Sequence, residues 1–508
     1  MQFNSFIFIL CFLPISLLGY FGLHCVGKKR LSQAFLLLMS LWFYGYFNPS
    51  YLLIICGSIV VNFLLSRLMY QRPGQSSDRQ KALLILGIVF NVALIFYFKY
   101  FDFFIANINT AFKTDFALRN IVLPLGISFF TFQQISFVVD SYRGETGDYS
   151  FLEYALFVAY FPQLVAGPIV LHSELIPQFR DSSKWRVSYD NLSKGVMLFT
   201  RGLAKKVLIA DTFGTAVAWG FSHADVFQGQ EALSVYEIII VMLSYTFQIY
   251  FDFSGYSDMA TGLGSMFNLD IPMNFNSPYK ALSVSDFWKR WHMTLTRFLT
   301  HYIYIPLGGN RKGKIRTYIN IMIVFLVSGI WHGANWTFIL WGVIHGLGQC
   351  FNRVTGGLHK RIMAAATRLK AGALLTGLIK CLQWLVTFAF VNVAWLLFRA
   401  DSVTQWVNLL KRMTVPYYEI RTELLECFRI PKIRFVFDFL HLAVTEEGQL
   451  YLGLYVIMAL ALVLCLCFKN NYEIVYKKNA LSLVFTWTVL TICVISLSRI
   501  STFLYFNF

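Results

Sequence analysis

The segment YINIMIVFLVSGIWHGANWTFILWGVIHGLGQC, from Tyr318 to Cys350, decides the fold because its length fits no simple membrane crossing. Its 33 residues include no Asp, Glu, Lys or Arg. One straight helix of that length would measure about 50 Å, against a hydrocarbon core of ~30 Å. Two full crossings need about 40 residues. The segment must therefore bend inside the membrane.

The two ends of this segment carry the same charge. Seven basic and no acidic residues lie in Phe287–Tyr318, and five basic and no acidic residues lie in Arg353–Lys370. Basic loops mark the cytoplasmic side of a membrane protein, so both ends are expected there. We therefore predict a pair of short helices that dip into the membrane and return, broken near Gly329 and Gly333. Irregular backbone at that depth survives only inside protein or beside a water-filled cavity.

The rest of the chain also has the composition of a membrane protein. Of 508 residues, 57% are hydrophobic and 14% are charged, whereas soluble domains carry about 25% charged residues. Apolar runs near membrane-spanning length recur at 2–23, 51–68, 82–98, 235–250, 451–468 and 480–497. With the less regular runs added, we predict an all-α integral membrane protein, a polytopic helical bundle of about ten to twelve membrane segments with re-entrant or broken helices.

The charge distribution sets the expected orientation. No Lys or Arg precedes the first apolar run, while Lys28, Lys29 and Arg30 follow it. A cleaved signal peptide has the opposite order, so this run is expected to stay in the membrane with the amino terminus outside. The same alternation places 174–206 and the two basic loops in the cytoplasm. It places Asp401–Gln449 outside as a large connecting loop, and the carboxyl terminus outside.

Charge and cysteine content exclude two classes of function. The net charge of +17 comes from short loops between apolar runs, which is typical of orientation signals, so no nucleic-acid partner is expected. A share of this charge remains available for an anionic donor or for lipid headgroups. The nine cysteines include no Cys-x-x-Cys pair, and several lie in apolar runs. A disulfide framework or a thiolate metal site is therefore not expected.

His332 is the leading candidate for a functional residue. It lies between Gly329 and Gly333 at the expected break, and an ionisable group at membrane depth is costly unless it serves a function. In a helix starting at His332, Asn335 and Trp336 would share its face. Asn335 is then expected to orient the imidazole or to hold a carbonyl. The alternative is a structural histidine bonded to a neighbouring backbone carbonyl.

His292 is the second candidate. Around it, apolar residues recur at helical spacing opposite basic ones, which predicts an amphipathic helix lying at the membrane interface. The apolar face comprises Trp288, Trp291, Leu295, Phe298 and Leu299. His301 and His345 are weaker candidates because helical rotation places them away from His292 and His332, respectively.

Further polar groups interrupt apolar stretches. Gln133 and Gln134 lie within 127–139, and Asp211, Asp252 and Asp258 lie in or beside other apolar runs. Membrane carboxylates usually pair with Lys or Arg, so a structural reading of these acids stays open beside a catalytic one.

Other chemistries lack their motifs. No His-Glu-x-x-His sequence occurs, and two histidines without a nearby carboxylate or thiolate make a poor metal set, so no metal is expected. No Gly-x-Ser-x-Gly elbow is present. Gly308–Lys314 matches the spacing of a phosphate loop, but Ile315 replaces its Ser or Thr. A buried histidine acting as a general base on a hydroxyl remains the best reading.

At this point the residues resemble the membrane-bound O-acyltransferase family, in the bacterial branch that includes alginate O-acetylases and the teichoic-acid D-alanylation acyltransferase. The resemblance runs from about residue 140 to 402. It is carried by YFPQLVAGPI (160–169), the 202–211 segment, FDFSGYSD (251–258), DFWKRWH (286–292), YIPLGGNR (304–311), GIWHGA (329–334) and the 395–400 segment. Several matched blocks in order make a chance similarity untenable.

The resemblance implies a domain plan and residue roles. It implies N-terminal transmembrane helices in 1–120, a catalytic core in 121–402 and an extracytoplasmic loop with C-terminal helices in 403–508, the bundle enclosing a central funnel or tunnel. His332 would be the active-site histidine and His292 the second functional histidine. Supporting roles fall to Asp211, Asn335 and Trp331. Donor or substrate binding is predicted for Lys289, Arg290, Asn310, Arg311 and Gln133.

The implied activity is O-acetyl transfer at the bacterial inner or plasma membrane. An acetyl thioester, expected to be acetyl-CoA, would enter from the cytoplasm as a substrate, with no bound cofactor. The acceptor would be a hydroxyl of an exported polysaccharide, or of an extracytoplasmic acetyltransferase partner that passes the acetyl group on. Two alternatives stay open: D-alanyl transfer from an acyl carrier protein to teichoic acid, and a lipid or acyl flippase without chemistry. Membrane lipid is the remaining expected partner.

Overall fold

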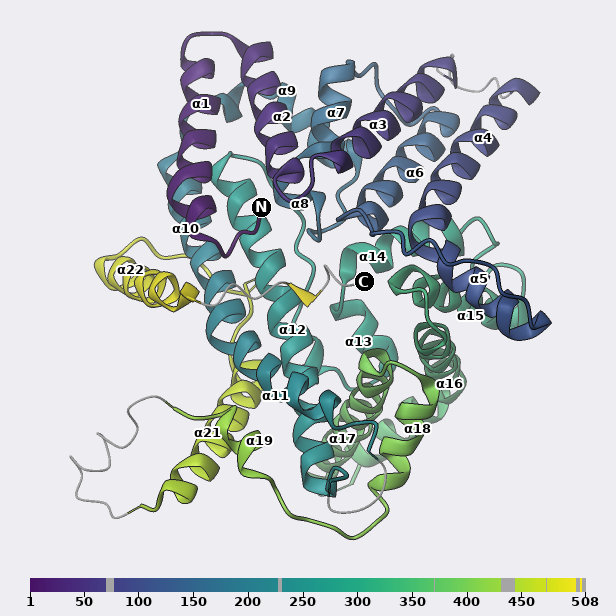
Figure 1. Cartoon of the computed structure of the whole chain (residues 1–508), viewed down its shortest axis with the longest axis vertical. Coiled ribbons are helices and arrows are strands. Elements are labelled where there is room, and N and C mark those ends of the chain that lie inside the picture. The colour runs from purple at the N-terminus through teal and green to yellow at the C-terminus, as the bar shows by residue number, and fades with distance from the viewer. Residues whose placement is uncertain are drawn as a thin grey trace.

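The computed structural model describes residues 1–69, 77–226, 231–369, 371–430, 444–471, 473–498 and 503–504. Their regular secondary structure is helical, as Figure 1 shows. Seven of the described helices are long and apolar enough to cross a membrane. They are Phe8–Cys25, Ser50–Met69, Asp78–Phe112, Val235–Met266, Lys314–His332, Gly372–Arg399 and Glu446–Leu466. The chain is therefore an all-α polytopic membrane protein.

This number is lower than the expected ten to twelve because several other helices are shorter or more polar than an isolated membrane span. Those helices are α2 (Lys29–Gly45), α6 (Ile127–Arg143), α10 (Tyr189–Ala204), α16 (Trp336–Thr367) and α22 (Ala480–Ile495). Hydrophobic runs alone do not separate such helices from true spans, because a helix surrounded by protein needs no continuous apolar surface.

The N-terminal helices form one side of the molecule. They are α1 (Leu13–Cys25), α2, α3 (Ser50–Met69), α4 (Asp78–Ile95) and α5 (Phe101–Phe112). A π-helical turn, Phe96–Tyr100, joins α4 to α5 without a break. In Figure 1 the turn between α1 and α2 lies at the same end of the molecule as the end of α3 and the start of α4. Lys28, Arg30 and Arg67 therefore lie at one end, as the charge pattern indicates.

The middle of the chain surrounds the long helix α12 (Val235–Met266). The elements before it are α6, α7 (Phe151–Ala159), α8 (Phe161–Leu164), α9 (His172–Arg180), α10, a π-helical segment (Lys205–Ala210) and α11 (Asp211–Ser222). Glycines bring α10 and α12 into close contact. A Cβ on Gly202 would lie 2.5 Å from the carbonyl oxygen of Gly255, and one on Gly262 would lie 2.7 Å from that of Gly195. Small residues at helix interfaces are typical of membrane bundles, where close packing replaces the hydrophobic effect.

The functional region is built from α13 (Val284–Arg290), α14 (Met293–Leu299), a π-helical turn (Thr300–Tyr304), α15 (Lys314–His332), α16 and α17 (Gly372–Arg399). Helices α15 and α16 pack on each other over much of their length. Gly329 lies inside α15, where a Cβ would meet the Phe338 carbonyl oxygen at 2.4 Å, and the chain breaks at 333–335 instead. Gly329 thus serves close packing and Gly333 the break.

The prediction of two short helices in 318–350 is wrong about their length. Helix α15 begins at Lys314 and α16 continues to Thr367, so most of the basic Arg353–Lys370 segment is helical rather than a loop. Lys and Arg are good helix formers, and their charged ends can leave the membrane while the helix continues. The turn between the helices reaches the end of α17, since the Asn335 side-chain amide donates to the Asp401 carbonyl oxygen at 2.9 Å.

The 401–449 segment is more than a simple connector. It contains α18 (Val403–Arg412) and α19 (Thr422–Glu426), and residues 431–443 lie outside the described part. Arg421 forms a bidentate ion pair with Glu237, with both contacts at 2.9 Å, and Gln405 donates to Asp225 at 2.8 Å. These contacts hold the segment against the start of α12 and the chain after α11. The remaining helices are α21 (Glu446–Leu466), α22 and three short 3₁₀ turns at 182–185, 278–280 and 496–498.

Candidate active site

His332 is the last residue of α15 and lies inside the bundle. Its side chain is almost completely enclosed, with 3% of the residue exposed. Aromatic rings surround it: Trp341 of α16 at 5.1 Å and Phe398 of α17 at 5.3 Å, measured between ring centroids. A helix end supplies the site because the chain turns at once through Gly333, leaving the imidazole at a corner that three helices share.

His292 is also buried, which corrects the expectation of an interfacial helix. The predicted helix is broken between α13 and α14, and His292 stands at the break with φ of 45° and no exposed surface. The apolar stripe around it, including Trp288, Trp291 and Leu295, faces the protein interior. Burial lowers the pKa of the His292 imidazole to about 3, so this ring is neutral at pH 7.

Trp331 joins the two histidines. Its ring centroid lies 4.9 Å from that of His332 and 6.1 Å from that of His292. The indole stacks on Phe132 at 5.3 Å, and its N–H donates to the Ser128 carbonyl oxygen at 3.3 Å. The structure therefore brings together both predicted catalytic histidines and the predicted supporting tryptophan, although they are 40 positions apart in the chain.

His345 is a third buried histidine in this cluster, and the sequence argument set it aside. The Trp288 indole N–H donates to Nδ1 of His345 at 3.1 Å, and Trp341 lies between His345 and His332, 4.7 Å and 5.1 Å from their ring centroids. Rotation along one helix gave the wrong answer because α15 ends at His332 and α16 runs back beside it. The signal that the sequence offered for this cluster was the Trp331–His332 pair at the expected break.

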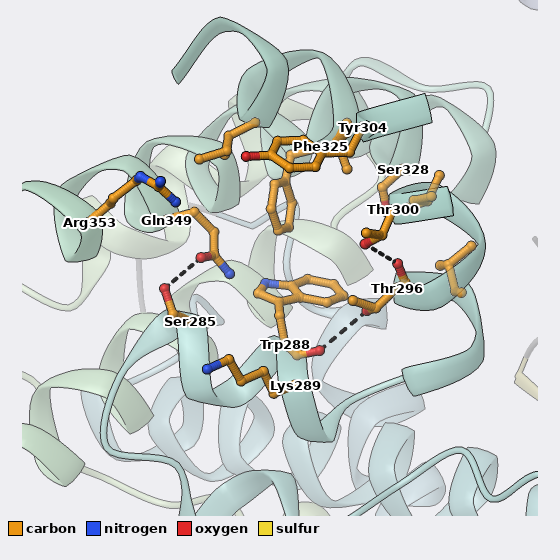
Figure 2. Close-up of a pocket in the computed structure, with 14 residues that line it drawn as sticks. Ser285, Trp288, Lys289, Thr296, Thr300, Tyr304, Phe325, Ser328, Gln349 and Arg353 are labelled. Carbon is orange, nitrogen blue, oxygen red and sulfur yellow. Dashed lines mark hydrogen bonds between the residues drawn. The ribbon is translucent and has the colours of Figure 1, made fainter. Parts of the chain in front are cut away.

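A cavity of about 410 Å³ lies between α13, α14, α15 and α16, and we name it the Trp288 cavity (Figure 2). Its apolar wall includes Leu295, Leu299, Ile321, Val324 and Phe325. Figure 2 shows Lys289 and Arg353 on the side of the cavity that also holds Ser285 and Gln349, with Thr296 and Thr300 on the opposite side. The Ser285 hydroxyl donates to the Gln349 side-chain oxygen at 2.6 Å. The cavity therefore combines an apolar wall with the cationic side chains of Lys289 and Arg353 at one edge.

A second cavity, of about 590 Å³, is lined by Phe398, which contacts His332, and we name it the Phe398 cavity. Its described lining residues are Gly214, Val217, Ala218, Gln248, Asn335, Phe338, Phe398, Arg399, Ala400, Asp401 and Leu504. None of them lines the Trp288 cavity. Ser328, one turn before His332, lines the Trp288 cavity, and Phe398, whose ring centroid lies 5.3 Å from that of His332, lines the Phe398 cavity. His332 itself lines neither cavity, but a neighbouring residue connects it to each of them.

Asn335 has a different role from the one predicted. It is the N-cap of α16: its side-chain oxygen accepts from the Thr337 N–H at 3.0 Å, and its amide donates to Asp401. The prediction assumed that a helix begins at His332, whereas one ends there. Asn335 consequently lines the Phe398 cavity instead of orienting the imidazole, and Trp336 is mostly exposed.

The predicted donor-binding residues separate into three groups. Lys289 lines the Trp288 cavity. Arg290 forms an ion pair with Asp286 at 2.9 Å, and Gln133 is buried and donates to the Val170 carbonyl oxygen at 3.3 Å. Asn310 and Arg311 are exposed on the turn before α15 and line neither cavity. Of the five, only Lys289 reaches a cavity beside the histidines.

Asp211 belongs to a buried ion network. Lys206 lies 2.8 Å from Asp211 and 2.7 Å from Asp252, and the Leu504 N–H donates to Asp252 at 3.0 Å. The neighbouring Lys205 forms an ion pair with Asp258 at 2.6 Å. These contacts favour the structural reading of all three acids over a catalytic one, since each carboxylate already has a lysine partner.

The described residues contain one group with suitable spacing for a metal ion: Asp140, Glu145 and His301. Two of the three are exposed, and Asp140 already accepts from the Tyr302 hydroxyl at 2.7 Å and lies 3.1 Å from Nε2 of His172. Such exposed acidic groups are common without a metal. The prediction of no metal stays a prediction.

Comparison with known proteins adds to this geometry. The family model described as MBOAT, membrane-bound O-acyltransferase family, matches residues 85–398. The chain is 38% identical to the peptidoglycan O-acetyltransferase of Helicobacter pylori, over 100% of this chain and 97% of that protein. It is 37% identical to the "Probable alginate O-acetylase AlgI" of Pseudomonas aeruginosa, over 79% of this chain and 73% of that protein. It is 28% identical to a teichoic acid D-alanyltransferase of Streptococcus thermophilus, over 56% of this chain and 69% of that protein.

Proposed function

Since the chain belongs to the membrane-bound O-acyltransferase family and is therefore an acyltransferase, we propose that it moves an acetyl group from a cytoplasmic thioester to a hydroxyl of an exported polysaccharide. The observation that carries this proposal is the position of His332 next to two cavities with no shared lining residue: Ser328, one turn earlier, lines one, and Phe398, in contact with the His332 ring, lines the other. A transfer across a membrane needs two substrates to reach one catalytic group from opposite sides. A histidine adjacent to two separate cavities supports such a transfer.

The Trp288 cavity suits the donor. An acetyl thioester such as acetyl-CoA carries a flexible arm in which two amide groups separate short apolar stretches, and phosphates lie at its far end. It needs a largely apolar channel with some hydrogen-bonding groups and with cations at its mouth. The apolar wall and the two cations Lys289 and Arg353 match these needs. The α16 segment that carries Arg353 continues into the basic 353–368 stretch, which the positive-inside rule places in the cytoplasm. The donor would therefore enter from that side.

The Phe398 cavity suits the acceptor. Gln248, Asn335, Arg399 and Asp401 give it polar groups that can bind sugar hydroxyls. It lies at the end of α17 that leads into the 401–426 segment, which the charge pattern places outside. The full-length similarity to a peptidoglycan O-acetyltransferase favours a cell-wall glycan as the acceptor. The hydroxyl could belong to the glycan itself or to a serine of an extracytoplasmic acetyltransferase that passes the acetyl group on.

The chemistry would be base-assisted acyl transfer. His332 would accept the proton of the attacking hydroxyl as its oxygen forms a bond to the acetyl carbonyl carbon. The C–S bond then breaks, and the thiolate that leaves takes the proton. His292, buried on the same Trp331 ring and with Nδ1 directed at the Asn274 side-chain oxygen, would assist as a hydrogen-bond acceptor that orients the attacking hydroxyl. Removing a general base typically lowers the rate by roughly 10²- to 10⁴-fold.

The alternatives differ in what they require. A flippase would need no acyl transfer, and the family assignment as an acyltransferase counts against it. D-alanyl transfer would need an acyl carrier protein on the cytoplasmic face, and the D-alanyltransferase match covers 56% of this chain against 100% for the peptidoglycan enzyme. A neighbouring gene for a secreted acetyltransferase would favour acetylation. Genes for a carrier protein and its ligase would favour D-alanylation.

The proposal can be tested with purified protein in proteoliposomes and in cells. Acetyl-CoA labelled in the acetyl group is supplied on one side, and labelled glycan oligosaccharide or extracytoplasmic acetyltransferase is recovered from the other. In cells, base-released acetate from the cell wall should fall when the gene is deleted and return with the wild-type copy but not with His332→Ala. If wall acetate stayed unchanged in the deletion strain while D-alanyl groups were lost, the proposed activity would be D-alanylation instead of acetylation.

A further inference from the structure

Lys99 is a cation in an unexpected place. It lies in the π-helical turn between α4 and α5. These helices and the turn form one apolar helix of 35 residues, and only 17% of its most apolar window is buried in the protein. A charged side chain on such a helix is costly and marks function unless it has a partner. Lys99 stands just beyond the apolar run 82–98, so the apolar pattern does not single it out.

The Lys99 ammonium is directed at the end of α15. It donates to the carbonyl oxygens of Trp331 at 2.6 Å and His332 at 3.1 Å, and to the Ser128 hydroxyl at 3.2 Å. It also lies 6.0 Å from the centroid of the Trp331 ring. The next residue, Tyr100, donates its hydroxyl to the Ile330 carbonyl oxygen at 2.5 Å. Two adjacent side chains of the π-helical turn thus bind three successive carbonyls of α15.

These contacts give hydrogen-bond donors to carbonyl groups at the end of a helix. The last carbonyls of a helix have no partner within it, and a cation there also interacts favourably with the helix dipole. π-helical turns often occur at functional sites, because the extra residue redirects side chains. The turn at 96–100 therefore sits where its lysine can hold the residue that carries the catalytic imidazole.

Lys99 differs from Lys205 and Lys206, the two lysines of the 205–210 π-helical segment. Lys205 pairs with Asp258, and Lys206 pairs with Asp211 and Asp252. Lys99 forms no ion pair with a carboxylate in the part of the chain that the structure describes, and its three acceptors match the three N–H bonds of an ammonium group. No donor is left for a substrate, so Lys99 acts through the backbone of α15.

We propose that Lys99 is a positioning residue for acyl transfer: its ammonium fixes the carboxyl end of α15 and thereby the direction of the His332 imidazole. This inference rests on the proposed function, because it assigns Lys99 to the same reaction. It predicts an effect on the chemical step without an effect on donor binding, since Lys99 lines neither cavity. A misplacement of about 1 Å can lower a rate by about 10²-fold.

The experiment compares variants in proteoliposomes with labelled acetyl-CoA. Lys99→Met removes the charge and all three donors, Lys99→Gln keeps one neutral donor group, and Lys99→Arg keeps the cation and can still bind the carbonyls. Tyr100→Phe removes one neutral bond to the same helix end, and Lys81→Met, at an exposed lysine of α4, is the matched control for the loss of a lysine. For each variant, kcat, donor KM and thermal stability in detergent are measured.

We expect Lys99→Met and Lys99→Gln to lower kcat by about 10- to 100-fold with donor KM within about 3-fold, and Lys99→Arg to recover most of the loss. Tyr100→Phe should lower kcat less than Lys99→Met, because it removes one neutral bond instead of three from a cation, and Lys81→Met should leave kcat unchanged. Wild-type kcat in either neutral variant would overturn the inference, as would equal losses in Lys99→Arg and Lys99→Gln. If Lys99→Met fails to insert, Lys99→Gln decides. An inactive wild-type protein would instead refute the proposed function.

Discussion

Nδ1 of His292 lies 3.2 Å from the side-chain oxygen of Asn274. The same oxygen accepts hydrogen bonds from the Thr294 N–H at 3.2 Å and from the Thr294 hydroxyl at 2.9 Å, so it is an acceptor. The neutral His292 ring must then carry its proton on Nδ1 and present the lone pair on Nε2. Asn274 therefore selects the tautomer of the second histidine.

The first prediction tests this selection. Asn274→Ala should lower kcat by about 10-fold, because the His292 ring loses the partner that fixes its tautomer and orientation. Donor KM should change little, since Asn274 lines neither cavity. Asn276→Ala is the matched control, because Asn276 contacts Asn470 rather than a histidine. Full turnover in Asn274→Ala would show that the tautomer is set in another way.

The second prediction concerns His332. His332→Ala should lower turnover by roughly 10²- to 10⁴-fold with little change in donor binding, because a general base acts on the proton and not on the donor. Donor binding and turnover are measured on purified protein in nanodiscs. His223→Ala, at a histidine after α11, controls for the loss of an imidazole. Near-normal acetylation by well-folded His332→Ala would exclude His332 as the base.

The third prediction separates His292 from the donor entrance. An interfacial helix would make His292→Ala weaken donor affinity, but the buried position of His292 against Phe253 and Trp331 predicts a loss of kcat instead. Lys289→Ala should do the reverse and raise donor KM several-fold, because Lys289 lines the Trp288 cavity. If His292→Ala raised donor KM and kept kcat, His292 would belong to the donor entrance and not to the site of proton transfer.

The fourth prediction concerns the stability of the Lys206 network. Lys206→Met should destabilise the protein by about 3–5 kcal/mol, because it leaves the buried Asp252 without its cation. Asp211→Asn should cost about 1 kcal/mol, since the Asp211 side chain is 24% exposed and Lys206 keeps Asp252. Thermal unfolding in detergent measures both. Equal losses would mean that the Lys206–Asp211 pair accounts for the whole effect of Lys206 and that the pair with Asp252 adds little. Loss of activity without loss of stability in Asp211→Asn would restore a catalytic role.

The fifth prediction concerns topology. In a cysteine-free background, single cysteines at 312 and 360 should react only with reagents supplied from the cytoplasm, and one at 420 only from outside. The Arg421–Glu237 pair holds the 420 region at the start of α12, so a cysteine at 236 should react from the same side as one at 420. Labelling of 312 from outside would reverse the proposed directions of donor and acceptor entry.

Local sequence was enough for the membrane character and for the place of His332. Apolar runs predict helices because no other structure satisfies backbone groups in lipid, apart from closed barrels. The glycines around His332, in a segment too long for one crossing, predicted a break, and α15 does end at His332. Helix lengths were less predictable, since the basic ends of α15 and α16 are helical although they lie outside the apolar segment.

The sequence by itself determined that this protein lies in a membrane and that a histidine stands at a broken helix, because both follow from the local balance of apolar and charged residues. Only the tertiary structure decided which side chains meet that histidine. Helical rotation relates residues along one continuous helix, and the break at 333–335 ends that relation. The contacts of Lys99 with the α15 carboxyl end, and of His345 with Trp288, join helices far apart in the chain, and no local pattern encodes such contacts.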